Sequence, residues 1–180
     1  MNLQKSESII EGCYTLKLPK QEDQRGFFVK CFHADFFKDS SEMPIIKEQY
    51  YSSSHKNVFR GMHFQLPPYD VLKLVFCVQG RVLDFVADLR KNSKTYGQCI
   101  HFELSCNNPT LLVIPSGLAH GFLTLSDKAI LHYMVSEVYQ PKYDSGIHYS
   151  SFQSIQLPPT VILSNRDQGF AKLIDFDSPF

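Results

Sequence analysis

The sequence of 180 residues lacks tryptophan, net charge and any long apolar run. Lys plus Arg number 18 and Asp plus Glu number 18, so the formal charge at pH 7 is zero. A balanced charge without a basic stripe or tail argues against binding to nucleic acid or to an anionic membrane surface. No apolar run approaches the roughly 20 residues that a membrane-spanning helix needs. We therefore expect neither nucleic acid nor a membrane as a partner.

Paired cysteines are also missing. The five cysteines are odd in number and contain no Cys-x-x-Cys pair; they are Cys13, Cys31, Cys77, Cys99 and Cys106. The first seven residues contain no apolar segment of the kind found in a secretory signal peptide. Reduced cysteines in a cytoplasmic protein are the simplest interpretation, and a structural zinc site is not expected.

Aromatic side chains are abundant, with 15 Phe and nine Tyr, and they favour β-strands. Short strand-like segments recur about every 8–12 residues between Pro- and Gly-containing turns, which is typical of a sandwich or barrel. Residues 33–38 could form one or two helical turns, and the chain is irregular after Pro141. We predict a single all-β domain over residues 1–180, in which low net charge leaves self-association possible.

The clearest predicted hairpin joins residues 71–79 to 82–89 around Gly80-Arg81. In a two-residue loop, Cys77 would face Asp84, and the alternation would place Lys73 on the same side of the sheet. The opposite face would be entirely apolar; it would contain Leu72, Leu74, Phe76, Leu83, Phe85 and Leu89.

Residues 60–65, Arg-Gly-Met-His-Phe-Gln, place polar groups inside an apolar strand, and Lys73 and Asp84 follow in the next two strands. An unpaired buried charge is costly, so these side chains indicate a pocket inside the sheet structure. Strict alternation would put Arg60 and His63 on opposite faces. Gly61 between them could mark a bulge that turns both side chains inward.

The chemistry of these groups suits proton transfer. The imidazole of His63 has an ordinary pKa near neutrality and could act as a base, while Lys73 and Arg60 could stabilise an oxyanion. Asp167 is a candidate to orient the imidazole, and Tyr133 could donate a proton from the opposite face. A lone strand His or Tyr is nevertheless more often a packing residue.

Two other functions remain open on the residues alone. A small cupin could bind a metal ion through His63 and His120, although no His-x-His pair with a following Glu is present and residue 65 is Gln. A sugar-binding or structural module without turnover is the other alternative.

Many of these segments together resemble the dTDP-4-dehydrorhamnose 3,5-epimerase family. The similarity runs in order and at matching spacing over about residues 8–168. The segments that carry it are residues 25–28, 60–65, 67–68, 73–75, 80–84, 86–90, 93–97, 104–105, 114–122 and 164–167.

The resemblance implies a cupin-type jelly-roll β-barrel, a homodimer, and neither a metal nor an organic cofactor. Members of the family invert carbons next to the C4 ketone of a nucleotide-linked 4-keto-6-deoxy sugar in deoxysugar and surface polysaccharide biosynthesis. His63 matches the family's base, paired with Asp167, and Tyr133 matches its acid. Lys73 would stabilise the enolate oxygen. A nucleotide-sugar 3,4-ketoisomerase with the same fold is the nearest alternative.

Substrate-binding positions carry over in the same way. Arg25, Arg60, His120 and Arg166 match positions around the sugar and diphosphate, and Tyr139 matches an aromatic residue that stacks on the base. Arg25 and Phe27 match a segment that reaches the partner's site. The complete expected set is Arg25, Phe27, Lys30, Glu48, Gln49, Tyr50, Arg60, Gln65, Asp84, His120, Tyr139, Asp144 and Arg166.

Several of these positions depart from the family pattern. Lys30 stands where the family usually has a nucleotide-contacting Glu, and residues 48–50, Glu-Gln-Tyr, replace a Gln-Asp-Asn-type run. Asp144 replaces a Glu, and Leu157 replaces a Trp. We therefore expect an epimerase whose nucleotide (dTDP, CDP or GDP) or sugar differs from the commonest one, or which inverts only one carbon.

Overall fold

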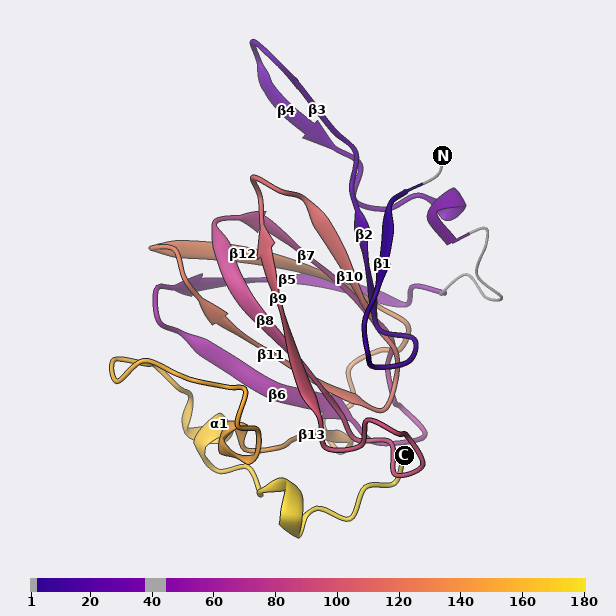
Figure 1. Cartoon of the computed structure of the whole chain (residues 1–180), viewed down its shortest axis with the longest axis vertical. Helices are drawn as coiled ribbons and strands as arrows, with labels where there is room; N and C mark the ends of the chain where they lie inside the picture. The colour runs from indigo at the N-terminus through magenta and orange to yellow at the C-terminus, as the bar shows by residue number, and fades with distance from the viewer. Residues whose placement is uncertain (1–2, 38–44) are drawn as a thin grey trace.

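The computed structural model describes residues 3–37 and 45–180, and two antiparallel sheets dominate it (Figure 1). The first sheet has the order β1-β2-β10-β7-β12-β5 and the second the order β13-β6-β11-β8-β9. The all-β prediction is confirmed. The first sheet comprises β1 (Lys5–Glu7), β2 (Tyr14–Lys17), β5 (Glu48–His55), β7 (Lys73–Gln79), β10 (Thr110–Ile114) and β12 (Lys128–Val135), and the second β6 (Phe59–Gln65), β8 (Arg81–Asp88), β9 (Cys99–Ser105), β11 (Leu118–Thr124) and β13 (Asp144–Gly146).

A two-stranded hairpin of β3 (Lys20–Asp23) and β4 (Gly26–Val29) projects from the body of the molecule (Figure 1). The helices are short, as expected: η1 (Ala34–Phe37), η2 (Tyr149–Ser151), α1 (Asn165–Gln168) and η3 (Leu173–Asp175). The predicted helical turn at 33–38 corresponds to η1, with residue 38 outside the described residues. In the described part of the chain, no helix has the length and apolar character needed to cross a membrane.

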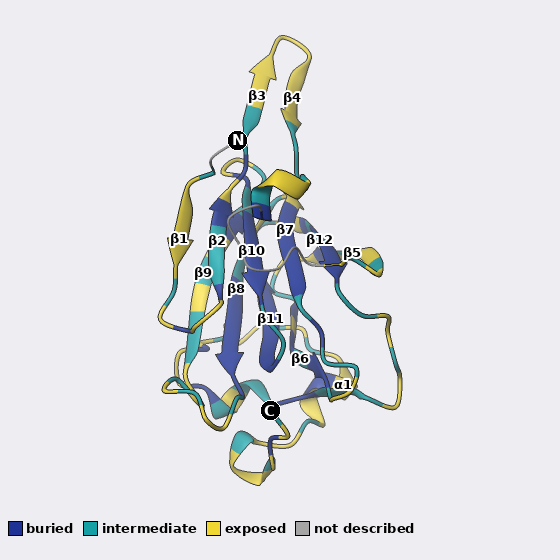
Figure 2. Ribbon diagram, turned by 90° about the vertical axis from the view of Figure 1, so that its right-hand side faces the viewer, coloured by how far each residue is buried: buried dark blue, intermediate teal, exposed yellow. Residues whose placement is uncertain are grey.

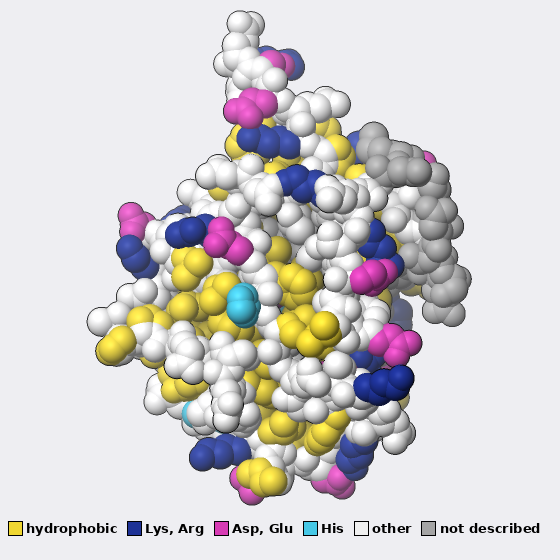
Figure 3. All heavy atoms as spheres, viewed as in Figure 1, with side chains coloured by type: hydrophobic (Ala, Val, Ile, Leu, Met, Phe, Trp, Pro, Cys, Tyr) yellow, Lys and Arg dark blue, Asp and Glu magenta, His cyan; other side chains and the backbone are white. Residues whose placement is uncertain are grey.

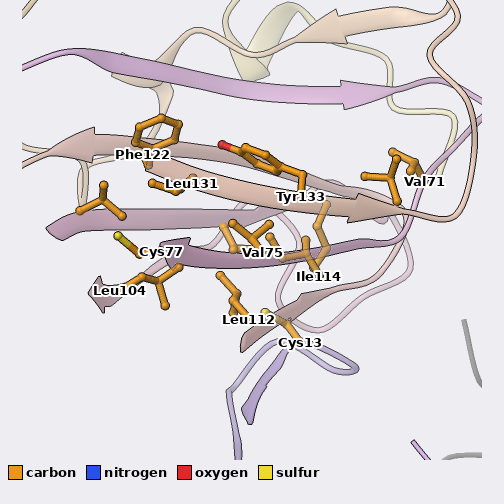
Figure 4. Close-up of a cluster of buried hydrophobic side chains, with 14 of the residues drawn as sticks. Cys13, Val71, Val75, Cys77, Leu104, Leu112, Ile114, Phe122, Leu131 and Tyr133 are labelled. Carbon is orange, nitrogen blue, oxygen red and sulfur yellow. The ribbon is translucent and has the colours of Figure 1, made fainter. Parts of the chain in front are cut away.

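The core is divided by the two sheets into three clusters, and buried residues follow the strands (Figure 2). The central cluster lies between the sheets and includes Val75, Cys77 and Val86 (Figure 4). The N-terminal segment covers the outer face of the first sheet, where Leu74 is buried. The C-terminal segment covers the outer face of the second sheet, where Phe85 is buried. Complete burial of each such side chain contributes about 1.5–3 kcal/mol to folding.

The predicted hairpin of 71–79 with 82–89 is wrong. β7 pairs with β10 and β12, whereas β8 pairs with β11 and β9, so the chain crosses from one sheet to the other at Gly80. Gly80 has φ +77°, and a Cβ there would collide with the carbonyl oxygen of Lys128. Alternation shows which side chains turn inward but not whether the next strand lies beside or opposite its predecessor. The apolar face of the supposed hairpin is therefore two separate faces in two clusters.

The bend predicted at Gly61 is confirmed. His120 is opposite His63 and Phe122 is opposite Arg60, so two residues of β6 oppose one residue of β11. This bulge places Arg60 and His63 on the same cavity despite their odd separation. Gly61 has φ +151°, and a Cβ there would lie 2.5 Å from Cα of Gly121. Only glycine fits this position without displacing β11.

Candidate active site

A cavity of about 380 Å³ lies between the two sheets. Its walls come from β5, β6, β7, β11, β12 and β13, together with residues after β12 and Arg166 of α1. Most of the sequence-predicted site residues line it. These are Glu48, Tyr50, Arg60, His63, Gln65, Lys73, His120, Tyr133, Tyr139, Asp144 and Arg166.

His63 and Asp167 meet although 104 positions separate them in the sequence. Nε2 of His63 lies 2.8 Å from Oδ1 of Asp167, whose other oxygen accepts the backbone N–H of Gly61 at 3.2 Å. Ser164 caps α1 by accepting the N–H of Asp167, which fixes the carboxylate at the start of this short helix. Burial alone would raise the pKa of Asp167, but the hydrogen bonds from His63 and Gly61 hold it below its ordinary value.

The environment of His63 favours a neutral imidazole at neutral pH. Burial lowers the pKa of His63, the bond to Asp167 opposes that shift, and the positive charges of Lys73 and Arg166 add to it. Because the ionised Asp167 can only accept a hydrogen bond, Nε2 carries the proton in the neutral ring. Nδ1 then holds the free lone pair.

Lys73 is a buried cation beside His63. Its Nζ donates to the backbone carbonyl of His63 at 3.0 Å. Burial lowers the pKa of Lys73 to about 8, with Asp144 and Asp84 opposing the shift. The ammonium form therefore predominates at neutral pH and can stabilise a negative oxygen in the cavity.

Tyr133 enters the cavity from β12 of the opposite sheet, and its ring lies among the side chains of the central apolar cluster (Figure 4). Burial raises the pKa of Tyr133 well above its ordinary value, so the phenol stays protonated. Its ring is stacked on Tyr50 and meets His120 edge to face at 6.0 Å. The phenol is thus held in a fixed orientation in the cavity and carries a proton that it can donate.

His120 and Asp84 form a second carboxylate–imidazole pair in the interior. Nε2 of His120 lies 3.0 and 2.9 Å from the two oxygens of Asp84. Burial raises the pKa of Asp84, and the nearby His120 and Lys73 oppose that shift. Asp84 does not line the cavity, so it orients His120 from behind instead of contacting a ligand directly.

Linked hydrogen bonds and an ion pair connect the residues at the rim of the cavity. The backbone N–H of Tyr139 donates to Glu48 at 2.7 Å, and the Tyr139 hydroxyl donates to Oδ2 of Asp144 at 3.0 Å. The same oxygen of Asp144 forms a 2.6 Å ion pair with Arg166. Gln65 accepts the N–H of residue 140 at 2.6 Å. These contacts tie the loop after β12 to β5, β6 and α1.

Five predicted substrate-binding residues, including Asp84, do not line the cavity of this chain. Gln49 is exposed on β5, because the strand alternation that turns Glu48 and Tyr50 inward turns Gln49 outward. Expectation and structure therefore differ at this position. Arg25, Phe27 and Lys30 belong to the projecting hairpin or directly follow it.

The sequence analysis missed two polar residues of the cavity, Ser52 and Glu137. Ser52 lies two residues after Tyr50 on the inward face of β5, so the alternation could have identified it. Glu137 follows β12 and pairs with Lys47 at 2.5 Å. No sequence signal distinguished it from an ordinary surface carboxylate.

Charges of both signs are intermixed over the face of the molecule in Figure 3, in keeping with the balanced composition. Within residues 3–37 and 45–180, no group of three or more His, Cys, Asp or Glu side chains is arranged to hold a metal ion. His63 and His120 each pair with a carboxylate.

Known proteins resemble this chain over nearly its whole length. The sequence model of the dTDP-4-dehydrorhamnose 3,5-epimerase family matches residues 7–175. The dTDP-4-dehydrorhamnose 3,5-epimerase of Escherichia coli strain K12 is 38% identical over 172 residues, which cover 93% of this chain and 92% of that protein. The dTDP-4-dehydrorhamnose 3-epimerase of Streptomyces niveus is 35% identical over 162 residues, which cover 88% of this chain and 78% of that protein.

A solved structure gives the same result. The dTDP-6-deoxy-D-glucose-3,5-epimerase of Legionella pneumophila Philadelphia 1, crystallised with dTDP-4-keto-L-rhamnose, matches with a TM-score of 0.91 and 30% identity. The match covers 98% of this chain and 95% of that chain. The all-β, cupin-type fold expected from the sequence is thereby confirmed. The chain belongs to the dTDP-4-dehydrorhamnose 3,5-epimerase family and is an isomerase of the epimerase class.

Proposed function

We propose that this chain inverts C3, C5 or both in a dTDP-linked 4-keto-6-deoxy sugar, or in a close variant of it, for deoxysugar biosynthesis. One observation carries the proposal: His63 from β6 and Tyr133 from β12 line one cavity from opposite sheets. A proton acceptor and a proton donor on opposite sides of a bound ring are what an inversion requires. The names of the relatives support the same substrate class.

The first step is removal of a proton next to the ketone. Nδ1 of His63 takes the proton, the C–H electron pair forms a carbon–carbon double bond, and the carbonyl electrons move onto the C4 oxygen. Asp167 holds the imidazole in the required tautomer and stabilises the imidazolium that forms. Lys73 supplies the positive charge that stabilises the enolate oxygen.

The second step returns a proton to the other face. The enolate collapses to the ketone as the carbon takes the proton of the Tyr133 hydroxyl. The resulting phenolate and imidazolium return to their starting forms by exchange with water. Burial keeps Tyr133 protonated until the carbanion accepts its proton. Each positioned acid or base of this kind contributes about 10²–10⁴-fold to the rate.

Arginine side chains provide sites for the diphosphate. Arg166 is exposed at the rim, and Arg60 is held by a 2.9 Å bond from its Nε to Oγ of Ser54. Guanidinium groups suit phosphate oxygens because two N–H groups can donate in parallel. Tyr139 at the rim supplies an aromatic face for the base.

The departures from the family pattern bear on specificity. Glu48, Tyr50 and Asp144 line the cavity, so these three of the replaced positions are placed to face a ligand. We propose that they shift the preferred nucleotide or sugar, or restrict inversion to one carbon. The name of the Streptomyces niveus relative, a 3-epimerase, shows that single-carbon members occur.

We also propose a homodimer in which Arg25 and Phe27 of one chain reach the site of the other. Arg25 projects on the hairpin and pairs with the nearby Asp23, and Phe27 is 53% exposed. Both are available to a second copy.

The test is incubation with dTDP-, CDP- and GDP-linked 4-keto-6-deoxyglucose in D₂O, followed by NMR. Deuterium at C3, C5 or both in at least one substrate is expected, and a folded His63→Asn variant should lose that exchange. Exchange that is absent with every substrate, or unchanged in the variant, would sink the proposal. Movement of the ketone from C4 to C3 would instead identify a 3,4-ketoisomerase.

A further inference from the structure

Phe170 contacts the side chain of His63 from outside the cavity. The ring centroids of Phe170 and His63 are 5.6 Å apart, and the ring planes meet edge to face at 74°. The ring also lies 5.2 Å from the guanidinium carbon of Arg166. Phe170 follows α1, the helix that carries Asp167 and Arg166. One aromatic ring therefore touches both the base and a cation at the rim of the cavity, although it does not line the cavity.

The ring of Phe170 occupies space left by a missing side chain. Gly146 of β13 pairs directly with His63 of β6. A Cβ at position 146 would lie 2.5 Å from Cζ of Phe170, much closer than carbon atoms approach. The absence of a side chain at Gly146 thus lets the ring lie against β13 next to the imidazole.

We propose that Phe170 is a positioning residue for His63: its ring fixes the plane of the imidazole and shields the His63–Asp167 hydrogen bond from water, in a niche that Gly146 leaves open. The inference rests on the proposed function, in which His63 is the base. It adds an aromatic support that does not touch the substrate.

The physical effect follows from what would replace the ring. Without Phe170, water would reach the side of the His63 imidazole and weaken its hydrogen bond to Asp167. The imidazole could then rotate away from the substrate carbon. Lost burial would also let the pKa of His63 rise toward its ordinary value, because burial is the main cause of its lowering.

Other charged or titratable groups lie around the imidazole; among them Lys73 and Arg166 limit this rise, whereas Asp167 favours it. Asp167 and Arg166 come from α1, Lys73 from β7, His120 from β11 and Asp144 from β13. All of them remain in a Phe170 variant. A change in titration would therefore report the lost ring and not a lost charge.

The test compares Phe170→Ala, Phe170→Leu, Gly146→Ala and the double variant Gly146→Ala/Phe170→Ala. We expect Phe170→Ala to lower kcat about tenfold with little change in KM, because misplaced catalytic groups cost rate and not binding. Phe170→Leu should retain most of the activity. Gly146→Ala should also lower kcat by displacing the ring, whereas the double variant should be no worse than Phe170→Ala because the new methyl group then has room.

A readout independent of turnover separates this inference from the proposed function. NMR titration of His63 should show a higher pKa in Phe170→Ala and in Gly146→Ala than in the wild type. Phe36→Ala, which removes a half-buried ring from the other outer cluster, is the matched control and should leave the titration unchanged. If no substrate is turned over but the pKa of His63 is higher in the variants, the proposed function fails while the role of Phe170 in the surroundings of His63 is supported. Two results would overturn the role of Phe170. One is a His63 pKa that is the same in the variants as in the wild type; the other is a fall in kcat in the double variant that equals the product of the falls in the two single variants.

Discussion

Tyr50 is stacked on Tyr133, with ring centroids 4.7 Å apart and ring planes 17° from parallel. The two residues are direct partners on β5 and β12. Burial raises the pKa of Tyr50 to about 12, so it too stays protonated. The proposed proton donor therefore has its ring fixed by a residue that departs from the family pattern.

Replacing Tyr50 by Ala should loosen the ring of Tyr133. Because a stacked aromatic pair contributes about 0.5–1.5 kcal/mol, we expect a stability loss of that order beyond the lost burial. We also expect a severalfold lower kcat, since Tyr133 would sample other rotamers. Urea denaturation and an epimerisation assay measure the two effects. Tyr51→Ala is the control, because Tyr51 is 71% exposed on the outward face of the same strand. Equal kcat values for the two variants would contradict the prediction.

The pH dependence of kcat/KM should be bell-shaped. The proposed base His63 can accept a proton only when its imidazole is neutral. Its lowered pKa means that the imidazole stays neutral at pH values at which an ordinary histidine is already protonated. Lys73 acts only when charged, and with a pKa of about 8 it loses its proton as the pH rises through that value. Activity should thus fall on the acid side as His63 is protonated and on the basic side near pH 8.

Lys73→Arg tests the assignment of the basic side. Arginine stays charged throughout this range, so a variant that retains activity should keep it above pH 8. Lys73→Met should lower kcat by about 10²–10³-fold, as loss of an oxyanion-stabilising group does. A basic limb that stays near pH 8 in Lys73→Arg would show that another group titrates there.

The fold class and much of the site could be predicted from the sequence, because both depend on local pattern. Alternation and turn residues gave an all-β chain, and Gly61 indicated the bulge that brings Arg60 and His63 together. Pairing across sheets could not be predicted in the same way. The supposed hairpin at Gly80 failed because face alternation is the same whether two strands share a sheet or face each other.

Some contacts between distant segments could not be predicted from the sequence, although the pairing of His63 with Asp167 was. No sequence pattern around Phe170 reveals its contact with His63. The room for the Phe170 ring comes from the absence of a side chain at Gly146, which a sequence pattern does not show. Gln49 was expected in the site from the family resemblance, whereas its position on β5 turns it away from the cavity of this chain.

Asp88 should be a major contributor to stability. Its buried carboxylate accepts bonds from Arg90 at 2.9 Å, from Ser93 at 2.6 Å and from Thr95 at 2.7 Å. Burial alone would raise the pKa of Asp88, but these bonds lower it to about 2. A lowered folded-state pKa stabilises the protein above the unfolded-state value and loses that contribution as the pH falls through about 2.

Asp88→Asn should therefore unfold at lower urea concentration at pH 7, with a loss of about 2 kcal/mol from the pKa difference. The gap between wild type and variant should narrow from pH 4 toward pH 2. Asp127→Asn, at a carboxylate that is almost fully exposed, is the control and should change little. A gap that does not vary with pH would show that the lost carboxylate charge is not the cause.

The projecting hairpin provides the test of the proposed dimer. Phe27 and Phe28 are 53% and 60% exposed on β4, and an isolated two-stranded ribbon is marginally stable in water. Burying both rings against a second copy would stabilise the ribbon and the dimer together. We expect the double variant Phe27→Ala/Phe28→Ala to dissociate at higher protein concentration than the wild type, measured by sedimentation velocity over a dilution series.

Activity should follow the dimer fraction, because Phe27 is proposed to reach the partner's cavity. Ile174→Ala, which removes an 89% exposed apolar side chain from η3, should leave the association unchanged. A wild type that is monomeric at micromolar concentration yet fully active would refute the dimer. A double variant that remains dimeric but loses activity would instead separate the two roles of the hairpin. The aromatic rings would then contact the substrate in the partner's cavity, and other residues would stabilise the dimer.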